Sequence, residues 1–520
     1  MASAADIENR WAITGALMLA TVMNTLDSTI ANTALPHMQG SLGAAQDQIV
    51  WVLTSYIIAT AIMTPLSGWL SLKIGRKPMF LVSISAFTLA SMACGAAQNL
   101  PEMVLFRLIQ GIAGATLMPL SQTVMLDIFP YAQIPRVMSI WSSAVIMGPI
   151  IGPVLGGWIT ENFTWRYCFY INLPIGILAF LGVLVFMERD RGGRQRPFDF
   201  LGFGALVAFV GAFQLMMDRG PSQDWFGSTE IWTYLVIACL GLWIFIIQTL
   251  SARQPFFHRD LARDRNFVST TFFSLFVGAL LFSTSAVLPQ FMQNILGYTA
   301  YQSGLASMPR GVGSLISFMG VPYLITLIGP RRTIIGGIVL CVAALWQMAH
   351  FDLSMTSRPI VVSGFVQGMG IGLLFAPLNV LAYATLDPVH RTEGTIVATM
   401  ARSLGSSLGI SAVQASVIRD ITIAHARLAE HIVPGNPVVD QALQGPIAPG
   451  APGGIALLDA YVSRQAAMIG YDTVFAWMTL AILLLAPMLV LMRPPAAQAG
   501  VTVQSLAGAP AKSGSAMAAE

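Results

Sequence analysis

The feature that most restricts the fold of this chain is a series of apolar runs, each close to 20 residues long, between Trp11 and Met492. A helix of about 20 apolar residues crosses a hydrocarbon core of about 30 Å. The runs predict fourteen transmembrane helices, over residues 11–35, 48–70, 78–98, 101–124, 137–159, 167–187, 199–217, 231–250, 267–290, 304–328, 333–351, 359–382, 395–417 and 473–492. The chain is therefore predicted to be an all-α integral membrane protein.

The low charge content agrees with a membrane protein. Charged residues make up 10% of the 520 residues and hydrophobic residues 55%, whereas a soluble chain carries about a quarter charged residues. This composition argues against a soluble enzyme, a disordered chain and a nucleic-acid-binding protein.

The distribution of basic residues predicts the orientation. With the N-terminus in the cytoplasm, 18 Lys and Arg lie in cytoplasmic segments and 6 in outer segments, as the positive-inside rule requires. An even number of spans places both termini in the cytoplasm. Residues 1–10 then form a cytoplasmic tail, and residues 493–520, rich in Ala, Gly and Ser, form a second tail that we expect to be disordered.

An internal repeat predicts two related halves. Gln110-Gly111 and Pro119-Leu120 are echoed by Gln367-Gly368 and Pro377-Leu378, and Ser28-Thr29 and Leu42-Gly43 by Ser283-Thr284 and Leu296-Gly297. The order of the matches predicts one six-helix half over 11–190, a second over 267–492, and two inserted helices over 199–250. Paired halves are typical of transporters, whose substrate site lies at the midplane between them.

One predicted outer segment is much longer than the others. Residues 418–472 contain helix-compatible stretches near 418–431 and 455–469, with a Pro- and Gly-rich centre between them. A long loop among short ones is typical of a functional or partner-binding segment. A tolerated surface insertion is the alternative, and the sequence does not decide between them.

Two ionisable residues inside predicted spans are candidate functional groups, because burying a charge in a membrane is costly. Asp27 lies about 24 Å along the first span, and Arg107 about 9 Å from the outer end of the fourth. These depths allow the two side chains to meet. A buried carboxylate that exchanges its proton could couple transport to a proton gradient; a fixed ion pair that locks two helices is the alternative.

Two further arginines lie in predicted spans of the second half. Arg310 is near the start of its span, and we expect it to extend toward the membrane interface. Arg402 could do the same.

Glycine and proline mark the fifth span. Gly148, Gly152 and Gly156 recur every four residues, and Pro149 and Pro153 lie beside them. Small residues at this spacing permit close helix approach, and prolines favour bending. A dimerisation face would explain the glycines, whereas the prolines favour a hinge or seal within one chain.

Some energy sources and sites are absent from the sequence. No Gly-Lys pair occurs, so the chain has no P-loop for ATP. The six histidines show no ligand-like spacing, so no metal site is predicted. No nucleophile motif indicates an enzyme, and an ion gradient is the remaining energy source.

Five segments resemble signature motifs of the major facilitator superfamily, in its 14-span drug:proton antiporter branch. They are Leu26–Pro36, Gly68–Lys77, Arg107 with Gln110-Gly111, Gly148–Gly157 and Trp165–Gly176. The resemblance extends over nearly all of 10–495 and is closest to the EmrB-type subgroup. It implies the major facilitator fold, with two inserted central helices.

The resemblance also implies a function. The family exports hydrophobic or amphipathic toxic compounds, including antibiotics, in exchange for protons, and needs no cofactor besides the proton gradient. Asp27 would be the proton-linked carboxylate, and Arg107 would modulate it. Conformational roles would fall to Gly68, Gly75, Arg76, Lys77, Gly148, Pro149, Gly152, Pro153, Gly156 and Gly157.

EmrB-type members work with a periplasmic adaptor and an outer-membrane channel. The resemblance therefore implies a multi-pass protein of a Gram-negative inner membrane, with 418–472 as the candidate adaptor contact. One position departs from the family: Leu72 stands where the loop motif usually has an acid thought to latch the inward-closed state, and the latch assignment is open.

Candidate substrate contacts are polar or aromatic residues within the spans: Asn24, Gln122, Trp141, Gln290 and Asn379. The 27 methionines suit a cavity that adapts to varied ligands. For each of these residues taken alone, helix packing is the simpler interpretation.

Two other functions remain open at this stage. A facilitator-type importer of a small nutrient or organic acid would share the architecture, although the Gly/Pro motif argues against it. A receptor or scaffold would need neither the repeat nor a buried acid.

Overall fold

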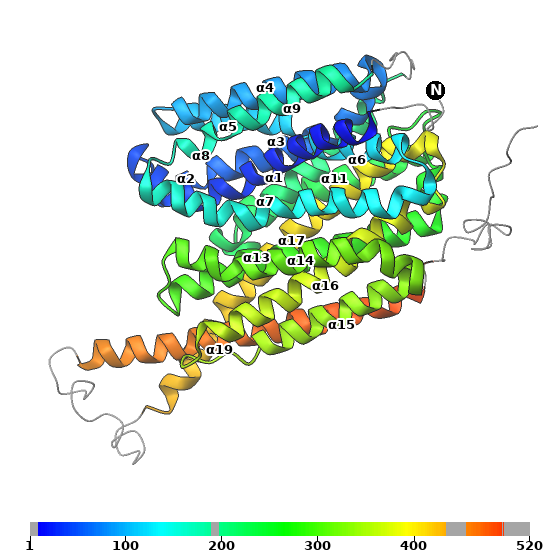
Figure 1. Ribbon diagram of the computed structural model, residues 1–520. Helices are drawn as coiled ribbons and strands as arrows, with labels where there is room; N and C mark the ends of the chain where they lie inside the picture. Colours follow the sequence, from blue (N-terminus) through cyan, green and yellow to red (C-terminus); the bar gives the residue numbers. More distant parts are fainter. Residues whose placement is uncertain (1–8, 189–196, 433–453, 491, 493–520) are drawn as a thin grey trace, which may run out of the picture.

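The computed structural model describes residues 9–188, 197–432, 454–490 and 492. These residues form a bundle of helices without a β-strand (Figure 1). The helices are α1 (Arg10–Ser41), α2 (Gln46–Ile49), α3 (Trp51–Ile74), α4 (Arg76–Ala96), α5 (Leu100–Gly114), α6 (Leu117–Ile128), α7 (Ile134–Asn162), α8 (Tyr167–Tyr170), α9 (Asn172–Phe186), α10 (Phe200–Arg219), α11 (Thr229–Ser251), α12 (Asp260–Arg263), α13 (Arg265–Asn294), α14 (Ala300–Ile328), α15 (Pro330–Met348), α16 (Ser357–Ala384), α17 (Arg391–Glu430) and α19 (Gly454–Leu485).

The fold class predicted from the sequence is confirmed. In the described part of the chain, 13 helical segments are long and apolar enough to cross a membrane. Helix α1, with 32 residues, is the fourteenth long helix of the bundle. It is not among the 13 segments because polar side chains such as Asn24, Asp27 and Thr29 lower its hydropathy. We call the end of the bundle where α1 begins the N-terminal face, and the other end the opposite face.

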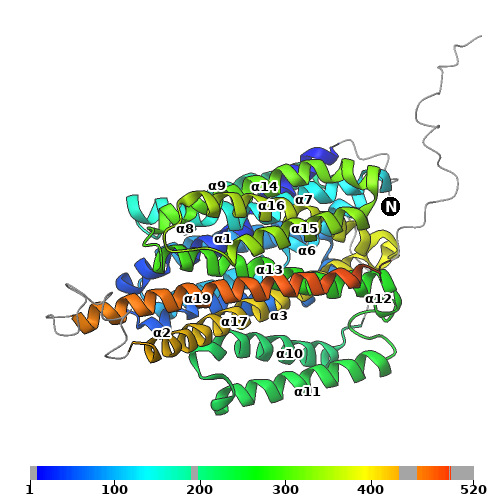
Figure 2. The ribbon, with the colours of Figure 1, turned by 90° about the horizontal axis from the view of Figure 1, so that it is seen from below.

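The helices form two groups with a pair beside them. Helices α1 to α9 make one group, and α13 to α19 the other. Helix α10 packs against α3 of the first group and α17 of the second, while α11 packs mainly against α10 (Figure 2). The inserted pair is therefore peripheral to the joint between the groups.

Backbone conformation supports the internal repeat. Gly43 after α1 and Gly297 after α13 both have positive φ, at 61° and 73°. Gly75 between α3 and α4, and Gly329 between α14 and α15, have φ of 97° and 81°. A left-handed backbone at these turns favours glycine. Each pair is 254 residues apart (297 − 43 and 329 − 75), so the same turn recurs at the same place in both halves.

The glycines of α7 lie against α1. A Cβ atom on Gly148 would overlap the backbone of Thr25, and one on Gly152 or Gly156 would overlap the hydroxyl of Thr29 or Thr33. The Thr29 hydroxyl donates a hydrogen bond to the Gly148 carbonyl over 2.9 Å. The stripe therefore brings two helices of one chain together, as the hinge or seal interpretation requires.

Two helices in the second half exceed the thickness of a bilayer. Helix α17 has 40 residues and α19 has 32, which correspond to about 60 Å and 48 Å at 1.5 Å per residue. Residues 418–430 and 454–472 of the predicted long loop are thus helical, and they extend beyond the bundle at the opposite face (Figure 1). The Pro-rich centre of that loop, 433–453, lies outside the described residues.

Candidate functional site

Asp27 lies at the centre of a buried polar cluster in the first half. Its side chain is fully buried on α1. Oδ2 accepts a hydrogen bond from Nη1 of Arg107 over 2.6 Å, and Oδ1 accepts from Nε2 of Gln110 and Nδ2 of Asn172, each over 2.8 Å. Helices α1, α5 and α9 therefore meet at one carboxylate.

Arg107 is fixed in place by hydrogen bonds and by an aromatic contact. Its Nε donates to the Val52 carbonyl over 3.1 Å, and its Nη1 also donates to Oε1 of Gln110 over 2.8 Å. Its guanidinium lies over the ring of Tyr56, with 4.2 Å between the guanidinium carbon and the ring centroid. A buried ion pair is tolerated when further hydrogen bonds satisfy both partners, and here they do.

Asn172 and Ser91 complete the cluster, and sequence reasoning did not single them out as site residues. Asn172 Nδ2 also donates to the Ser91 hydroxyl over 2.9 Å, and Ser91 donates to the Phe169 carbonyl. Both side chains are fully buried. Asn172 lies in the Trp165–Gly176 motif at the start of the sixth span. An amide side chain in such an apolar helix could have been recognised from the sequence as a candidate site residue.

The hydrogen bonds around Asp27 share one direction. All three side chains that bond the carboxylate act as donors. A protonated carboxyl group carries an O–H that needs an acceptor. One buried acceptor beside it is unused: Oδ1 of Asn172 has no hydrogen-bond partner in the described structure. Protonation would therefore change the bonding between α1 and α9.

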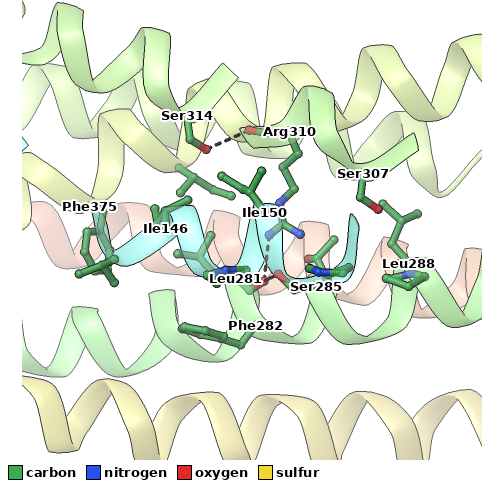
Figure 3. A pocket seen from close by; sticks show the side chains of 16 residues that line it. Ile146, Ile150, Leu281, Phe282, Ser285, Leu288, Ser307, Arg310, Ser314 and Phe375 are labelled. Carbon is green, nitrogen blue, oxygen red and sulfur yellow. Dashed lines mark hydrogen bonds between the residues drawn. The ribbon is translucent and has the colours of Figure 1, made fainter. Parts of the chain in front are cut away.

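Helix α7 connects this cluster to a pocket. One face carries the glycines that pack on α1 around Asp27. Another face, with Pro149, Ile150 and Pro153, lines a pocket that is completed by α13, α14 and α16 (Figure 3). The pocket lies between the two halves and has a cavity volume of about 70 Å³ in this conformation, so it must widen to reach the volume of about 300–1,000 Å³ typical of small-molecule sites. Its wall is mostly apolar.

Three of the five predicted substrate contacts meet at the joint between the halves. Gln122 on α6 donates to Asn379 on α16 over 3.1 Å. Trp141 on α7 stacks on Phe375 of α16, with ring centroids 6.5 Å apart, and Phe375 lines the pocket. These residues close the joint below the pocket, toward the N-terminal face.

The other two predicted contacts lie elsewhere. Asn24 is buried within the first half, where it donates to the Gly114 carbonyl and to the Tyr56 hydroxyl. Gln290 is exposed near the end of α13. Neither lines the pocket between the halves.

Arg310 does not extend toward the interface as expected from the sequence. It lies ten residues into α14, about 15 Å along the helix, and its side chain lines the pocket (Figure 3). Its Nη2 donates to the Leu281 carbonyl over 2.9 Å. The snorkelling expectation is wrong because α13 supplies an acceptor inside the bundle.

Ionic contacts join the halves at the N-terminal face. Asp127, at the end of α6, accepts from Arg76 of α4 over 2.7 Å and lies 3.4 Å from Arg391 of α17. Arg391 also donates to the Leu126 carbonyl. Gly68 on α3 packs closely against α17, because a Cβ atom at this glycine would overlap the Ile396 side chain. The loop motif thus participates in closing this face.

The loop motif contains three further residues with a defined turn or contact: Gly75, Lys77 and Leu72. Gly75 provides the positive-φ turn between α3 and α4, and Lys77 Nζ donates to the Leu184 carbonyl over 2.8 Å. Leu72, at the position of the usual acid, lines a small pocket with Glu393 of α17. The acid that faces Arg391 is Asp127.

Removing Asp127 is expected to loosen the N-terminal face. The side chains of this ionic contact are 15–21% exposed, so each pair contributes at most about 1 kcal/mol. In an Asn379→Cys reporter on a Cys239→Ala background, Asp127→Ala should speed maleimide labelling from this face by about two- to fivefold. Glu188→Ala, which removes an exposed acid at the same face, should leave the rate unchanged. Equal rates for both variants would contradict a closing role.

The structure brings a distant histidine next to a nearby His and Asp pair. His258, Asp260 and His390 have ligand-type atoms within 4.8 Å of one another. The two rings stack with centroids 4.4 Å apart. Because 132 residues separate the histidines, their pattern along the chain gave no sign of this cluster.

Two six-helix groups around a midplane pocket, with a buried carboxylate beside it, define a membrane transporter of the paired-half type. The sequence model of the Major Facilitator Superfamily matches residues 17–410. The chain belongs to this superfamily.

Two relatives support this family assignment, and one solved structure supports the fold. The chain is 35% identical over 427 residues to the "Multidrug export protein EmrB" of Escherichia coli (strain K12), covering 82% of this chain and 83% of that protein. It is 31% identical over 486 residues to the "Fatty acid resistance protein FarB" of Neisseria gonorrhoeae, covering 93% and 96%. The crystal structure of the human organic anion transporter MFSD10 has the same fold, with a TM-score of 0.59 at 12% identity, covering 91% of this chain and 99% of that one.

Proposed function

We propose that this chain is a proton-coupled multidrug efflux transporter. It exports hydrophobic or amphipathic toxic compounds from the cytoplasm or inner leaflet by alternating access. The observation that carries this proposal is the position of α7, which packs on α1 around Asp27 and also lines the pocket between the halves. The printed names of the relatives, multidrug export and fatty acid resistance, support export as the direction.

The coupling step is a change in the hydrogen bonding of Asp27. When the carboxylate is ionised, Arg107, Gln110 and Asn172 all donate to it. When it takes a proton, the attraction to Arg107 falls and the new O–H requires an acceptor, which Asn172 Oδ1 would supply if its amide turned. Proton binding thus alters the contact of α1 with α5 and α9.

This change reaches the pocket through the α1–α7 contact. Because the Gly148 region of α7 touches α1 without intervening side chains, a shift of α1 moves α7 with it. The pocket wall at Pro149 and Pro153 then moves relative to α13 and α14. Such a rearrangement alternates access to a midplane site.

The arrangement of contacts corresponds to one state of this cycle. The joint is closed toward the N-terminal face by Gln122 with Asn379, Thr123 with Thr395, and Asp127 with Arg391. With both termini in the cytoplasm, as the basic residues predict, this is the cytoplasm-closed state.

The protein would lie in a bacterial inner membrane. It would perform no covalent chemistry, because the proton gradient supplies the energy for transport.

The test is transport by purified protein in proteoliposomes of defined orientation. An imposed pH gradient should drive movement of a lipophilic dye against its concentration gradient. Dissipating the gradient with an uncoupler should abolish that movement, and wild-type cells should survive higher concentrations of several unrelated toxic compounds than cells without the gene. Proton-dependent accumulation of a sugar or organic acid, with no export of any dye, would instead establish an importer.

The extensions of α17 and α19 are the proposed contact for a periplasmic adaptor, which would in turn bind an outer-membrane channel. They lie beyond the bundle, and they contact each other through His425 and Asp459, whose Nε2 and Oδ1 are 3.1 Å apart. Ile455 and Tyr461 are exposed there. The double variant Ile455→Ser, Tyr461→Ser should reduce capture of a co-expressed adaptor at least fivefold and preserve dye transport in proteoliposomes. Undiminished capture would place the contact elsewhere.

A further inference from the structure

The pocket between the halves contains a positive charge that the proposed coupling mechanism does not use. Arg310 makes one hydrogen bond to protein, to the Leu281 carbonyl of α13. A guanidinium has five N–H donors. Among the described residues no carboxylate lies within ion-pair distance of it, whereas Arg107 is paired with Asp27. Its remaining donors are available to the pocket that its side chain lines.

A second unpaired cation lies behind the pocket wall. The guanidinium carbon of Arg402 on α17 is 4.8 Å from the ring centroid of Phe375 and 5.8 Å from that of Trp141. The described residues provide no carboxylate partner for it either, and its Nη2 donates a hydrogen bond to the Thr399 hydroxyl over 3.4 Å. Because Phe375 lines the pocket, both arginines contribute positive potential to the same space.

Neither arginine is easily explained as a packing residue alone. The bond from Arg310 to Leu281 ties α14 to α13, but one hydrogen bond to a neutral carbonyl offsets little of the cost of placing a charge inside the bundle. At mid-bundle depth, water is scarce and a pairing anion would be strongly favoured. The rest of the wall, including Ile146, Ile150 and Leu288, is aliphatic.

We propose that Arg310 is a specificity-determining residue that binds the carboxylate of an anionic amphiphile, while the aliphatic wall of this pocket holds the apolar part. The guanidinium and a carboxylate form a charge-assisted, bidentate pair. Arg402 stabilises the same anion at longer range, through Phe375. This inference rests on the proposed function and names a substrate class for it: single-chain organic acids.

The test compares an acid with its neutral ester. Dansyl-aminoundecanoic acid and its methyl ester differ in the charge of the head group and in one methyl group, and dansyl fluorescence reports entry into an apolar site. Binding is measured at neutral pH to the full-length protein in phosphatidylcholine proteoliposomes. Wild-type protein should bind the acid more tightly than the ester, and Arg310→Gln should weaken binding of the acid about tenfold or more, as expected for a hydrogen-bonded charge. Binding of the ester should change less than twofold.

Three further variants complete the test. Arg310→Lys keeps the charge without the planar fork, so it should recover part of the affinity for the acid. Arg402→Gln should weaken binding of the acid less than Arg310→Gln does. Arg332→Gln removes an exposed arginine near the start of α15 and should have no effect.

Several outcomes would overturn the proposal. Arg310→Gln could weaken the acid and the ester equally, which would indicate a role in helix packing. Wild-type protein could bind the ester but not the acid, or phosphatidylglycerol in the vesicles could displace the acid, which would assign the charge to a lipid head group. The proposed function fails separately, if the wild-type protein moves neither probe nor any neutral dye under a pH gradient.

Discussion

Replacing Asp27 with asparagine is expected to abolish transport driven by a pH gradient, by a factor of at least about one hundred. Asparagine cannot bind and release a proton, and its side chain gives Arg107 no negative partner. The two side chains lie 2.6 Å apart and are both fully buried. Leaving one buried charge uncompensated also costs about 3–5 kcal/mol of stability. The measurement is dye transport into proteoliposomes at a series of imposed pH gradients.

Controls separate coupling from folding in this experiment. Exchange of labelled for unlabelled dye at equal pH on both sides needs the protein to alternate but does not need net proton movement. The Asp27→Asn protein should retain measurable exchange, and the double variant Asp27→Asn, Arg107→Gln should recover stability without recovering coupled transport. Asp352→Asn, at an exposed acid, should transport normally. Full gradient-driven transport by Asp27→Asn would exclude Asp27 as the coupling carboxylate.

Adding a side chain to Gly148 is expected to reduce transport more than tenfold. A methyl group there would overlap the backbone of Thr25, which cannot move aside as a flexible side chain would. Overpacking a tight contact costs about 1–3 kcal/mol, and here it separates α7 from the helix that carries Asp27. Gly148→Val should therefore lower the thermal unfolding temperature as well as transport, measured on the same purified samples.

Gly15→Ala is the matched control for this substitution. Gly15 lies within α1, the helix against which Gly148 packs, but a Cβ atom on Gly15 meets nothing within 4 Å. Helix propensity favours alanine over glycine by up to about 1 kcal/mol, so Gly15→Ala should be as stable as the wild type or more so, with normal transport. If Gly148→Val transports as well as Gly15→Ala, the tight α1–α7 contact is not needed for the transport cycle.

Much of the architecture could be predicted because the membrane imposes a simple rule on sequence. Each span must be about 20 apolar residues long, and this rule alone identified the fourteen rods. Helix α1 was predicted as a span because its first half is apolar, although its polar residues keep it out of the 13 segments that are apolar enough to cross a membrane. The contact of Asp27 with Arg107 was expected from depth alone, and the structure places them 2.6 Å apart; their role in proton coupling stays a prediction.

The contacts of individual side chains could not be predicted, because they depend on which faces of the helices meet. Asn24 and Gln122 are similar amides in apolar helices, yet Asn24 packs within one half and Gln122 crosses the joint to Asn379. Arg310 was assigned to the interface because depth along one helix does not show that α13 supplies a carbonyl inside the bundle. The helix-compatible stretches near 418–431 and 455–469 were recognised from the sequence. Residues beyond the bilayer need not be apolar, so hydropathy did not show that each stretch continues a membrane span as part of α17 or α19.

Helix α10 limits how far the two halves can move apart. Its Asp218 accepts a hydrogen bond from Thr54 of α3 in the first half. Its Gln214 accepts from Ser407 of α17 in the second half over 2.7 Å, and its Met217 carbonyl accepts from Ser411. A single rigid helix that is bonded to both halves acts as a strut. Large rocking of the halves must break one set of these bonds, so a 14-helix transporter of this design is expected to open with a smaller swing than one without the inserted pair.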